Sequence, residues 1–192
     1  MTELATALEG KLLIAMPNLA DPNFWHTVVL VGVHTEDDGA FGLVVNRPLD
    51  IDLKEILDEL GAEVEGETFP QVLSGGPVEP SHGFVLYEDA NTEAWDDAAL
   101  RIDQNLTVSG STETLTKLAH GRIGSRYYLL LGYSGWHPGQ LEHEIEQNSW
   151  LVAPLDSSIL FDVPIEQRWA AALRSIGVDP GTLVDLGPGD PS

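Results

Sequence analysis

The sequence predicts a single α/β (α+β) domain built around a largely antiparallel sheet. Apolar runs of strand length recur along the chain, and single helix patterns interrupt them without the regular strand–helix alternation of a doubly wound fold. The Glu-Asp-Asp-Gly turn at residues 36–39 joins two such runs and leaves room only for a hairpin. The 192 residues, 43% of them hydrophobic, are enough for one core, and no apolar run approaches the ~20 residues of a membrane-spanning helix.

The first half of the chain is expected to supply five strands and one helix. The run at residues 26–34 is β-branched and apolar, as expected of a strand that is buried on both faces. Asp52 can cap the helix that follows, Glu55 completes a capping box, and Gly61 ends the helix. The strands are predicted at residues 11–15, 26–34, 41–45, 71–73 and 83–87.

The second half is expected to mix short strands with three helices. The first of these helices is predicted at residues 111–120. The second follows Pro138 and places Leu141 and Ile145 along one side, and the third begins near Pro164, a favoured first-turn residue. The strands of this half are predicted at residues 100–102, 106–108, 125–131 and 149–153.

The composition of the chain predicts where the domain ends and in which cellular compartment the protein is found. Residues 1–177 form the predicted domain, and the Pro- and Gly-rich residues 178–192 form a predicted C-terminal tail. The chain has no cysteine, which excludes disulfides, zinc thiolate sites and a thiol nucleophile together. The N-terminal residues lack the positive start and long apolar stretch of a secretory signal, so a cytoplasmic location is expected, without a membrane partner.

The formal net charge of −22 is the strongest global signal, with 31 acidic against nine Lys and Arg residues. Residues 1–96 alone carry 19 of these acids and three of these bases. Such a surface repels phosphate backbones, so direct contact with nucleic acid is not expected. Two interpretations of the charge stay open. One is adaptation to a salt-rich, halophilic cytoplasm, where the Debye length falls to ~3 Å at 1 M, and the other is an ordinary solubilising surface.

Four blocks of sequence resemble the corresponding blocks of the YqgE/AlgH family, a group of small bacterial proteins whose biochemical function is poorly defined. Four blocks in this order and at this spacing would very rarely match by chance, and the resemblance covers residues 10–177. The blocks are residues 13–17 with 21–24 and 27–29, residues 42–48, residues 74–78 with 83–86, and residues 132–136 with 138–142, 144–145 and 148–151.

The resemblance implies one compact domain with mainly antiparallel strands in a barrel-like, bifurcated arrangement, flanked by helices. It also implies a bacterial cytosolic protein with no established cofactor. The AlgH part of the family name reflects a proposed role in controlling gene expression. This chain departs from a typical member mainly in its charge, which argues further against direct contact with DNA.

Three turns that follow predicted strands are the candidate binding features. Arg47 can fork onto a carboxylate or phosphate there, although a salt bridge to a nearby acid is the plainer interpretation. The Gly75-Gly76 turn can offer backbone N–H groups to an anion, or can simply join two strands. The Gly-rich turn after residue 131 carries Trp136, either exposed for a partner or folded onto the next helix. We predict that the three turns converge on one surface.

No catalytic residue and no metal site are predicted. Ser134 lies in a Gly-Tyr-Ser-Gly-Trp sequence, but a nucleophile elbow needs glycine where this chain has Trp136. The sequence His143-Glu144 starts like the helix of a zinc protease, yet Gln147 stands where the second histidine is required. Neither motif therefore predicts its chemistry, and no cofactor is expected.

These features favour a non-catalytic module that binds an unidentified protein or small ligand. A second hypothesis is an enzyme acting on a small anionic substrate, with Arg47 as clamp and backbone amides as oxyanion donors, although no base or nucleophile is evident. A third is the transcriptional regulator that the family name suggests. The candidate binding residues are Asn46, Arg47, Pro48, Ser74, Gly75, Gly76, Pro77, Tyr133, Ser134, Gly135, Trp136, Gln140 and Glu142.

Overall fold

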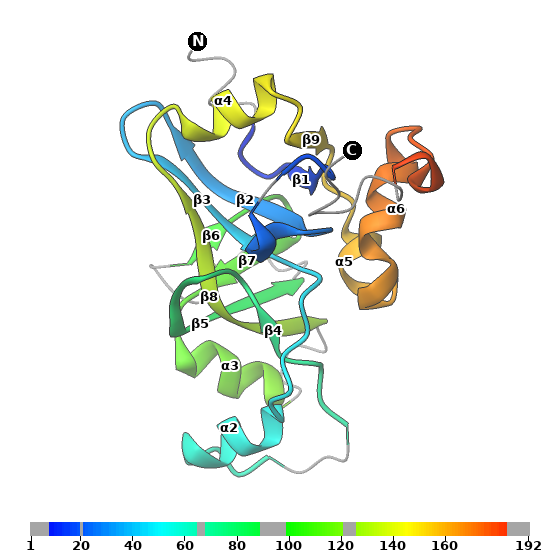
Figure 1. Cartoon of the computed structure of the whole chain (residues 1–192). Coiled ribbons are helices and arrows are strands. Elements are labelled where there is room, and N and C mark those ends of the chain that lie inside the picture. The colour runs from blue at the N-terminus through cyan, green and yellow to red at the C-terminus, as the bar shows by residue number, and fades with distance from the viewer. Residues whose placement is uncertain (1–7, 20, 65–67, 89–98, 121–125, 184–192) are drawn as a thin grey trace.

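The computed structural model describes residues 8–19, 21–64, 68–88, 99–120 and 126–183, and these contain nine strands in one sheet (Figure 1). The strands are β1 (Leu12–Ala15), β2 (Val28–Thr35), β3 (Gly39–Val44), β4 (Leu73–Ser74), β5 (Val78–Glu88), β6 (Leu100–Arg101), β7 (Leu106–Ser109), β8 (Tyr127–Trp136) and β9 (Trp150–Ala153). Their order is β6-β7-β5-β8-β3-β2-β1-β9, and β4 pairs with β8 beside this path.

Helices cover different parts of the sheet (Figure 1). Helix α6 packs against β1, β2 and β9, α4 packs against β3 and β9, and α3 packs against β5. None of the helices in the described part of the chain is long and apolar enough to cross a membrane. The helices are α2 (Leu53–Glu59), α3 (Thr112–Ala119), α4 (Gln140–Glu146), α5 (Ser157–Phe161) and α6 (Arg168–Ser175), and the 3₁₀ turns are η1 (Pro22–Phe24), η2 (Ile165–Gln167) and η3 (Pro180–Thr182).

Strands β1 and β2 are buried on both faces, as their apolar sequences predict. Alternate residues of a strand point to opposite faces, so Leu12 and Leu13 enter different parts of the core. Leu12 belongs to a cluster that includes α5 and α6, whereas Leu13 belongs to a cluster with Trp136 and Trp150 near α4. The middle of the sheet is therefore enclosed by helices on either side.

The predicted start of α2 is confirmed. The Asp52 side chain accepts a hydrogen bond from the backbone N–H of Lys54 at 3.0 Å, which satisfies one of the free donors at the helix N-terminus. Gly61 follows the helix with a φ of 74°, a left-handed conformation that favours glycine. The Asp52 cap and the end of the helix at Gly61 were thus readable from the sequence.

The glycine-rich segment after residue 131 is not a turn, which corrects the prediction. Strand β8 continues through it to Trp136 and changes its partners on the way. Residues 127–133 pair with β5, and residues 134–136 pair with β3. Gly132, with a φ of 79°, provides the bend at which this change occurs. Residue 125, predicted to begin this strand, lies outside the described residues.

The change of partners makes the sheet bifurcated, as the family resemblance implied. The sheet is not a closed barrel, however, because β6 and β9 stand at opposite ends of the strand order and do not pair with each other. Helices α4 and α6 both pack against β9 at one of these ends. The domain is therefore one open, largely antiparallel sheet flanked by helices, and only the β4–β8 pair is parallel among the described strand pairs.

Helix α5 was not predicted, because five residues are too few to display a helical period. Asp156 caps it by accepting a hydrogen bond from the backbone N–H of Ser158 at 3.0 Å. The predicted tail begins with an ordered segment: Pro180 is buried in η3, and Val178 packs against the same cluster as α6. Residues 184–192 of that tail lie outside the described residues.

Candidate functional site

Two of the three candidate turns lie side by side and form a shallow pocket. The turn after β3 contributes Arg47, and the turn after β4 contributes Gly76. The pocket has a volume of about 280 Å³, and we call it the Arg47 pocket. Its lining residues are Pro22, Asn23, Val44, Arg47, Pro48, Leu49, Ser74, Gly76 and Pro77.

The Asn46 side chain holds the end of β3 against the start of β2. Its Oδ1 accepts a hydrogen bond from the backbone N–H of Val28 at 2.8 Å, and its Nδ2 donates to the carbonyl oxygen of His26 at 2.8 Å. On the other side, the carbonyl oxygen of Arg47 accepts a hydrogen bond from the N–H of Ser74 at 2.8 Å. Asn46 therefore positions its neighbour Arg47 by bonding to β2 and the segment before it.

The Arg47 guanidinium has no carboxylate partner among the described residues. Its Nη2 donates to the carbonyl oxygen of Trp25 at 2.5 Å, and none of the described ion pairs includes it. By contrast, Lys54 pairs with Asp58 and Arg126 with Glu88. The salt bridge that was the plainer interpretation of Arg47 is thus not found, although the chain has 31 acidic residues.

Three stacked rings stand beside Arg47. The ring centroids of Trp25 and His26 are 4.0 Å apart, and those of His26 and Trp169 are also 4.0 Å apart, with interplanar angles of 15° and 11°. Trp25 is 40% exposed at the outer end of this stack. The stack joins the segment before β2 to helix α6, so it fixes the main chain that receives the Arg47 hydrogen bond.

His26 has unusual surroundings for a histidine. Its φ is 54°, and its Nε2 atom is buried without a hydrogen-bond partner in the structure. Burial and then the positive charge of Arg47 lower the pKa of His26, because both disfavour the imidazolium. The imidazole is therefore held neutral at physiological pH, between two indoles.

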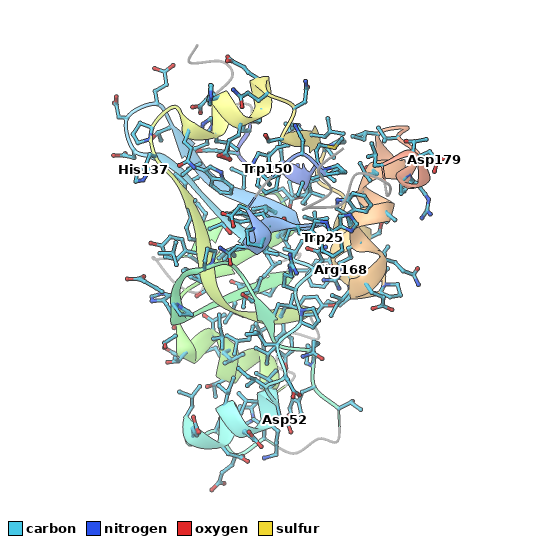
Figure 2. The ribbon with its side chains drawn as sticks, in the orientation of Figure 1. Trp25, Asp52, His137, Trp150, Arg168 and Asp179 are labelled. Carbon is cyan, nitrogen blue, oxygen red and sulfur yellow. The ribbon has the colours of Figure 1, made fainter. Side chains whose placement is uncertain are left out.

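Arg168 is a buried arginine that the sequence analysis did not single out. It is 1% exposed, and its Nη1 donates to the carbonyl oxygen of Val45 at 2.6 Å. Its Nη2 donates to the hydroxyl of Tyr128 at 2.6 Å, and it has no carboxylate partner among the described residues. Arg168 therefore ties α6 to the residue just before Asn46-Arg47. Figure 2 shows Trp25 and Arg168 near the same end of the sheet.

The sequence did hold a signal for Arg168. The residue shares a helix face with Ala172 and lies next to Trp169, so its side chain had to enter the core. A charged side chain on an apolar helix face is unusual enough to mark a buried polar contact. Trp25 had no such signal, and His26 was predicted as the first residue of a strand, whereas β2 begins at Val28 and His26 lies in the segment before it.

The Gly75-Gly76 pair lies directly against the backbone of β8. A Cβ atom on Gly76 would lie 2.3 Å from the carbonyl carbon and oxygen of Tyr133, and one on Gly75 would lie 2.3 Å from the carbonyl oxygen of Gly132. These glycines are therefore required for close approach of two main chains. The same contact places Ser74 and Gly76 in the wall of the Arg47 pocket.

Ser134 supports this contact and is not placed as a nucleophile. It is fully buried, and its Oγ donates a hydrogen bond to the carbonyl oxygen of Gly75 at 3.1 Å. Its neighbour Tyr133 packs against Phe41 and Phe84, with ring centroids 5.2 and 6.0 Å away. Both residues thus hold the sheet together at its point of bifurcation.

The third candidate segment contacts the Gly75-Gly76 turn through residues 132–134, but its Trp136 end lies away from Arg47. Trp136 pairs with Ala40 at the far end of β3 from Arg47, and its neighbour His137 lies at the far end of the sheet from Trp25 in Figure 2. The predicted convergence of all three turns is therefore wrong for the segment that contains Gly135 and Trp136. The physical reason is that this segment is a strand, so each residue carries the chain further from Gly75.

Trp136 is folded onto helix α4, one of the two arrangements expected from the sequence. It is 5% exposed, and its Nε1 donates to Oε1 of Glu144 at 3.1 Å. The Nε1 of Trp150 donates to the same oxygen at 3.0 Å, and Gln140 donates to the other carboxylate oxygen at 3.2 Å. Glu142 lies nearby on α4 and pairs with His34. These residues form a structural network.

Metal chemistry finds no support in the described residues. No group of three or more His, Asp or Glu side chains there is arranged to hold a metal ion. In the His143-Glu144 sequence that resembles the start of a zinc-protease helix, Glu144 accepts hydrogen bonds from the indole N–H groups of Trp136 and Trp150.

The comparison with protein families identifies the family of this chain. A family model described as AlgH-like matches residues 12–181. The chain belongs to the AlgH-like family. This confirms the resemblance found in the four sequence blocks, all of which lie within or overlap the matched region. A UPF0301 protein of Magnetococcus marinus is 44% identical over 184 residues, which are 95% of this chain and 96% of that protein. One from Xanthomonas campestris is 43% identical over 187 residues, or 96% and 97% of the two chains.

Solved structures share the AlgH-like fold. The solution structure of the AlgH protein from Pseudomonas aeruginosa has a TM-score of 0.74 and 38% identity, and the match covers 92% of this chain and 93% of that one. The crystal structure of a protein from Corynebacterium diphtheriae has a TM-score of 0.69 and 25% identity, with coverage of 89% and 91%. The names of these AlgH-like and UPF0301 proteins state no reaction and no ligand.

Proposed function

We propose that this AlgH-like protein is a non-catalytic module that binds an anionic group of a small ligand or protein partner in the Arg47 pocket. The observation that carries the proposal is the unpaired guanidinium of Arg47. The chain has 31 acids against nine Lys and Arg residues, yet within the described part of the structure Arg47 bonds to a carbonyl oxygen and pairs with no carboxylate. An arginine kept free of carboxylates inside a pocket is suited to an external anion.

The local electrostatics support this proposal. Arg168 carries a second buried positive charge close to the end of β3, because it donates to Val45, two residues before Arg47. Burial lowers the pKa of Arg47, yet arginine remains protonated in proteins. Field lines from these charges are focused where the surrounding protein has low dielectric constant. The pocket is thus a local positive site on a strongly acidic molecule.

Catalysis is a weaker alternative at this site. An enzyme that clamps an anionic substrate with Arg47 also needs a base or a nucleophile within hydrogen-bond reach. His26 stands beside Arg47, but its Nε2 is buried and both faces of its ring are covered by indoles. Ser134 is fully buried and donates to Gly75. These residues are suited to holding the pocket in shape.

A role in gene regulation would, on this proposal, act through the bound anion or a protein partner. Direct contact with DNA is opposed by the net charge of −22, since each phosphate contact must overcome repulsion from the acidic surface. A bound ligand, in contrast, needs only the one local site. The binding proposal therefore accommodates the regulatory label without an interface to nucleic acid.

The test is a titration of the protein with small carboxylates and phosphates, followed by NMR amide correlation spectra. Arg47→Gln removes the charge, and Arg174→Gln is the matched control, because Arg174 is exposed on α6 and belongs to no described ion pair. Charge-assisted hydrogen bonds contribute about 1.5–3 kcal/mol, so Arg47→Gln is expected to weaken binding by about 10- to 150-fold. Equal binding by both folded variants, or no binding by the unsubstituted protein, would contradict the proposal.

A further inference from the structure

The charges around the Arg47 pocket constrain the ligand more narrowly than its position does. Arg47 is the single charged residue among the lining residues of the pocket. Arg168 donates to Val45, Val163 and Tyr128 and does not line the pocket. The lowered pKa of His26 leaves its ring neutral. One positive charge is therefore available to a ligand by direct contact.

Acidic residues belong to the segments that border the pocket. Asp21 precedes the lining residues Pro22 and Asn23, and its side chain accepts a hydrogen bond from the N–H of Asn23 at 2.9 Å. On the other side, a second hollow shares Pro48 and Leu49 with the pocket and is lined by Asp50 and Asp52. A ligand with two negative charges would have only one of them neutralised by Arg47 and would leave the other beside these acidic segments, on a molecule whose net charge is −22.

The walls of the pocket favour a compact apolar body behind the charged group. Five of its nine lining residues are apolar or proline: Pro22, Val44, Pro48, Leu49 and Pro77. Its volume of about 280 Å³ lies just below the range of about 300–1,000 Å³ for drug-sized ligands.

From these observations we infer that the pocket selects a singly charged carboxylate carried on a small apolar group, in preference to a phosphate. The inference rests on the proposed function and specifies its ligand. The planar fork of the guanidinium matches a carboxylate with two parallel hydrogen bonds, and only one of its five N–H donors is used on Trp25. One negative charge is neutralised by Arg47, and no second charge is left to face the flanking aspartates.

Two sources can present this chemistry. One is a free monocarboxylic acid, and the other is the C-terminal carboxylate of a peptide that ends in an apolar residue. In the second case the preceding residues would lie in the adjoining hollow, which has a volume of about 400 Å³ and contains Ile51, 39% exposed. The same experiment separates the two sources through a pair of peptides.

The test compares three probes with the same aromatic ring and different charge. These are 3-phenylpropionate, its neutral amide, and phenyl phosphate, which is doubly charged at pH 8 because its second pKa is about 6. Affinities are measured by NMR titration at physiological ionic strength. We expect the carboxylate to bind at least about tenfold more tightly than the phosphate, and the amide not to bind. Acetyl-Pro-Leu with a free C-terminus, compared with its amide, tests the peptide source.

Three variants make the outcomes distinguishable. Arg47→Gln is expected to abolish the carboxylate preference, and Arg174→Gln to retain it. Asp50→Asn, at an exposed position, removes one flanking charge and is expected to narrow the difference between carboxylate and phosphate. Phosphate binding that depends on Arg47 and equals or exceeds carboxylate binding would overturn the inference and leave the proposed function standing. If neither anion binds in an Arg47-dependent way, both fail.

Discussion

The carboxylate of Glu144 is expected to stabilise the packing of Trp136 and Trp150 against helix α4. It accepts hydrogen bonds from the indole N–H groups of Trp136 and Trp150, at 3.1 and 3.0 Å, on one oxygen. Glu144→Ala removes this acceptor and leaves both donors in the core. The matched control is Glu146→Ala on the same helix, because Glu146 is exposed and its removal changes the net charge equally.

The expected loss of stability follows from the burial of the two indoles. Trp136 is 5% exposed and Trp150 is 1% exposed, so both indole N–H groups depend on this acceptor in the folded protein. A hydrogen bond to a charged group contributes about 1.5–3 kcal/mol. Glu144 itself is half-buried and water can enter its place, so we take the lower value for each bond and expect a loss of about 3 kcal/mol. For a chain of 192 residues this lowers Tm by about 6–12 °C.

The assay is urea unfolding followed by tryptophan fluorescence, with thermal unfolding by circular dichroism alongside. Glu144→Gln keeps an oxygen acceptor without the charge and is expected to lie between the unsubstituted protein and Glu144→Ala. Glu146→Ala is expected to stay within about 0.5 kcal/mol of the unsubstituted protein. If Glu144→Ala were as stable as Glu146→Ala, the carboxylate would not be holding the indoles. Trp136 would then return as a candidate for contact with a partner.

Two further predictions concern the environment of the Arg47 pocket. The pKa of His26 is lowered in the folded protein, so the unfolded chain takes up this proton first, and the free energy of unfolding is expected to fall as pH drops below about 6.5. His26→Asn, which tolerates positive φ, should flatten this part of the stability profile, and an unchanged slope would refute the assignment. Gly76→Ala is expected to cost at least about 3 kcal/mol in urea unfolding, since its Cβ would lie 2.3 Å from the Tyr133 main chain. Gly61 has a φ of 74° with open space around it, so Gly61→Ala should lower the free energy of unfolding by only about 1–2 kcal/mol. Equal losses for Gly61→Ala and Gly76→Ala would contradict the close-approach argument.

The local features of the fold were accessible from the sequence wherever one short segment decided them. Asp52 predicted the start of α2 because a cap is made by neighbours in the chain. The β-branched run in β2 predicted burial on both faces. Helix α5 was not predicted because five residues do not display a helical period. Strand β8 was predicted too short because a glycine that permits a bend within a strand cannot be told from a glycine in a turn by sequence.

The candidate site was only partly accessible. The sequence singled out Arg47 and Gly76 correctly as neighbours, since both follow strands and strand ends in one sheet can share an edge. It misplaced Trp136, because its prediction treated part of β8 as a turn. Nothing in the sequence predicted the stack beside Arg47, because the contact of His26 with Trp169 joins residues more than a hundred positions apart.

The sequence by itself determined the family, the antiparallel α/β class and the acidic character of the protein, because each depends on composition or on short, ordered motifs. Only the tertiary structure decided that Arg47 has no carboxylate partner among the described residues, that Arg168 fixes the strand end before it, and that Trp136 packs onto α4 with its N–H on Glu144. Pairing among 31 acids and nine bases is a question of distance in space, and the folded chain alone sets those distances.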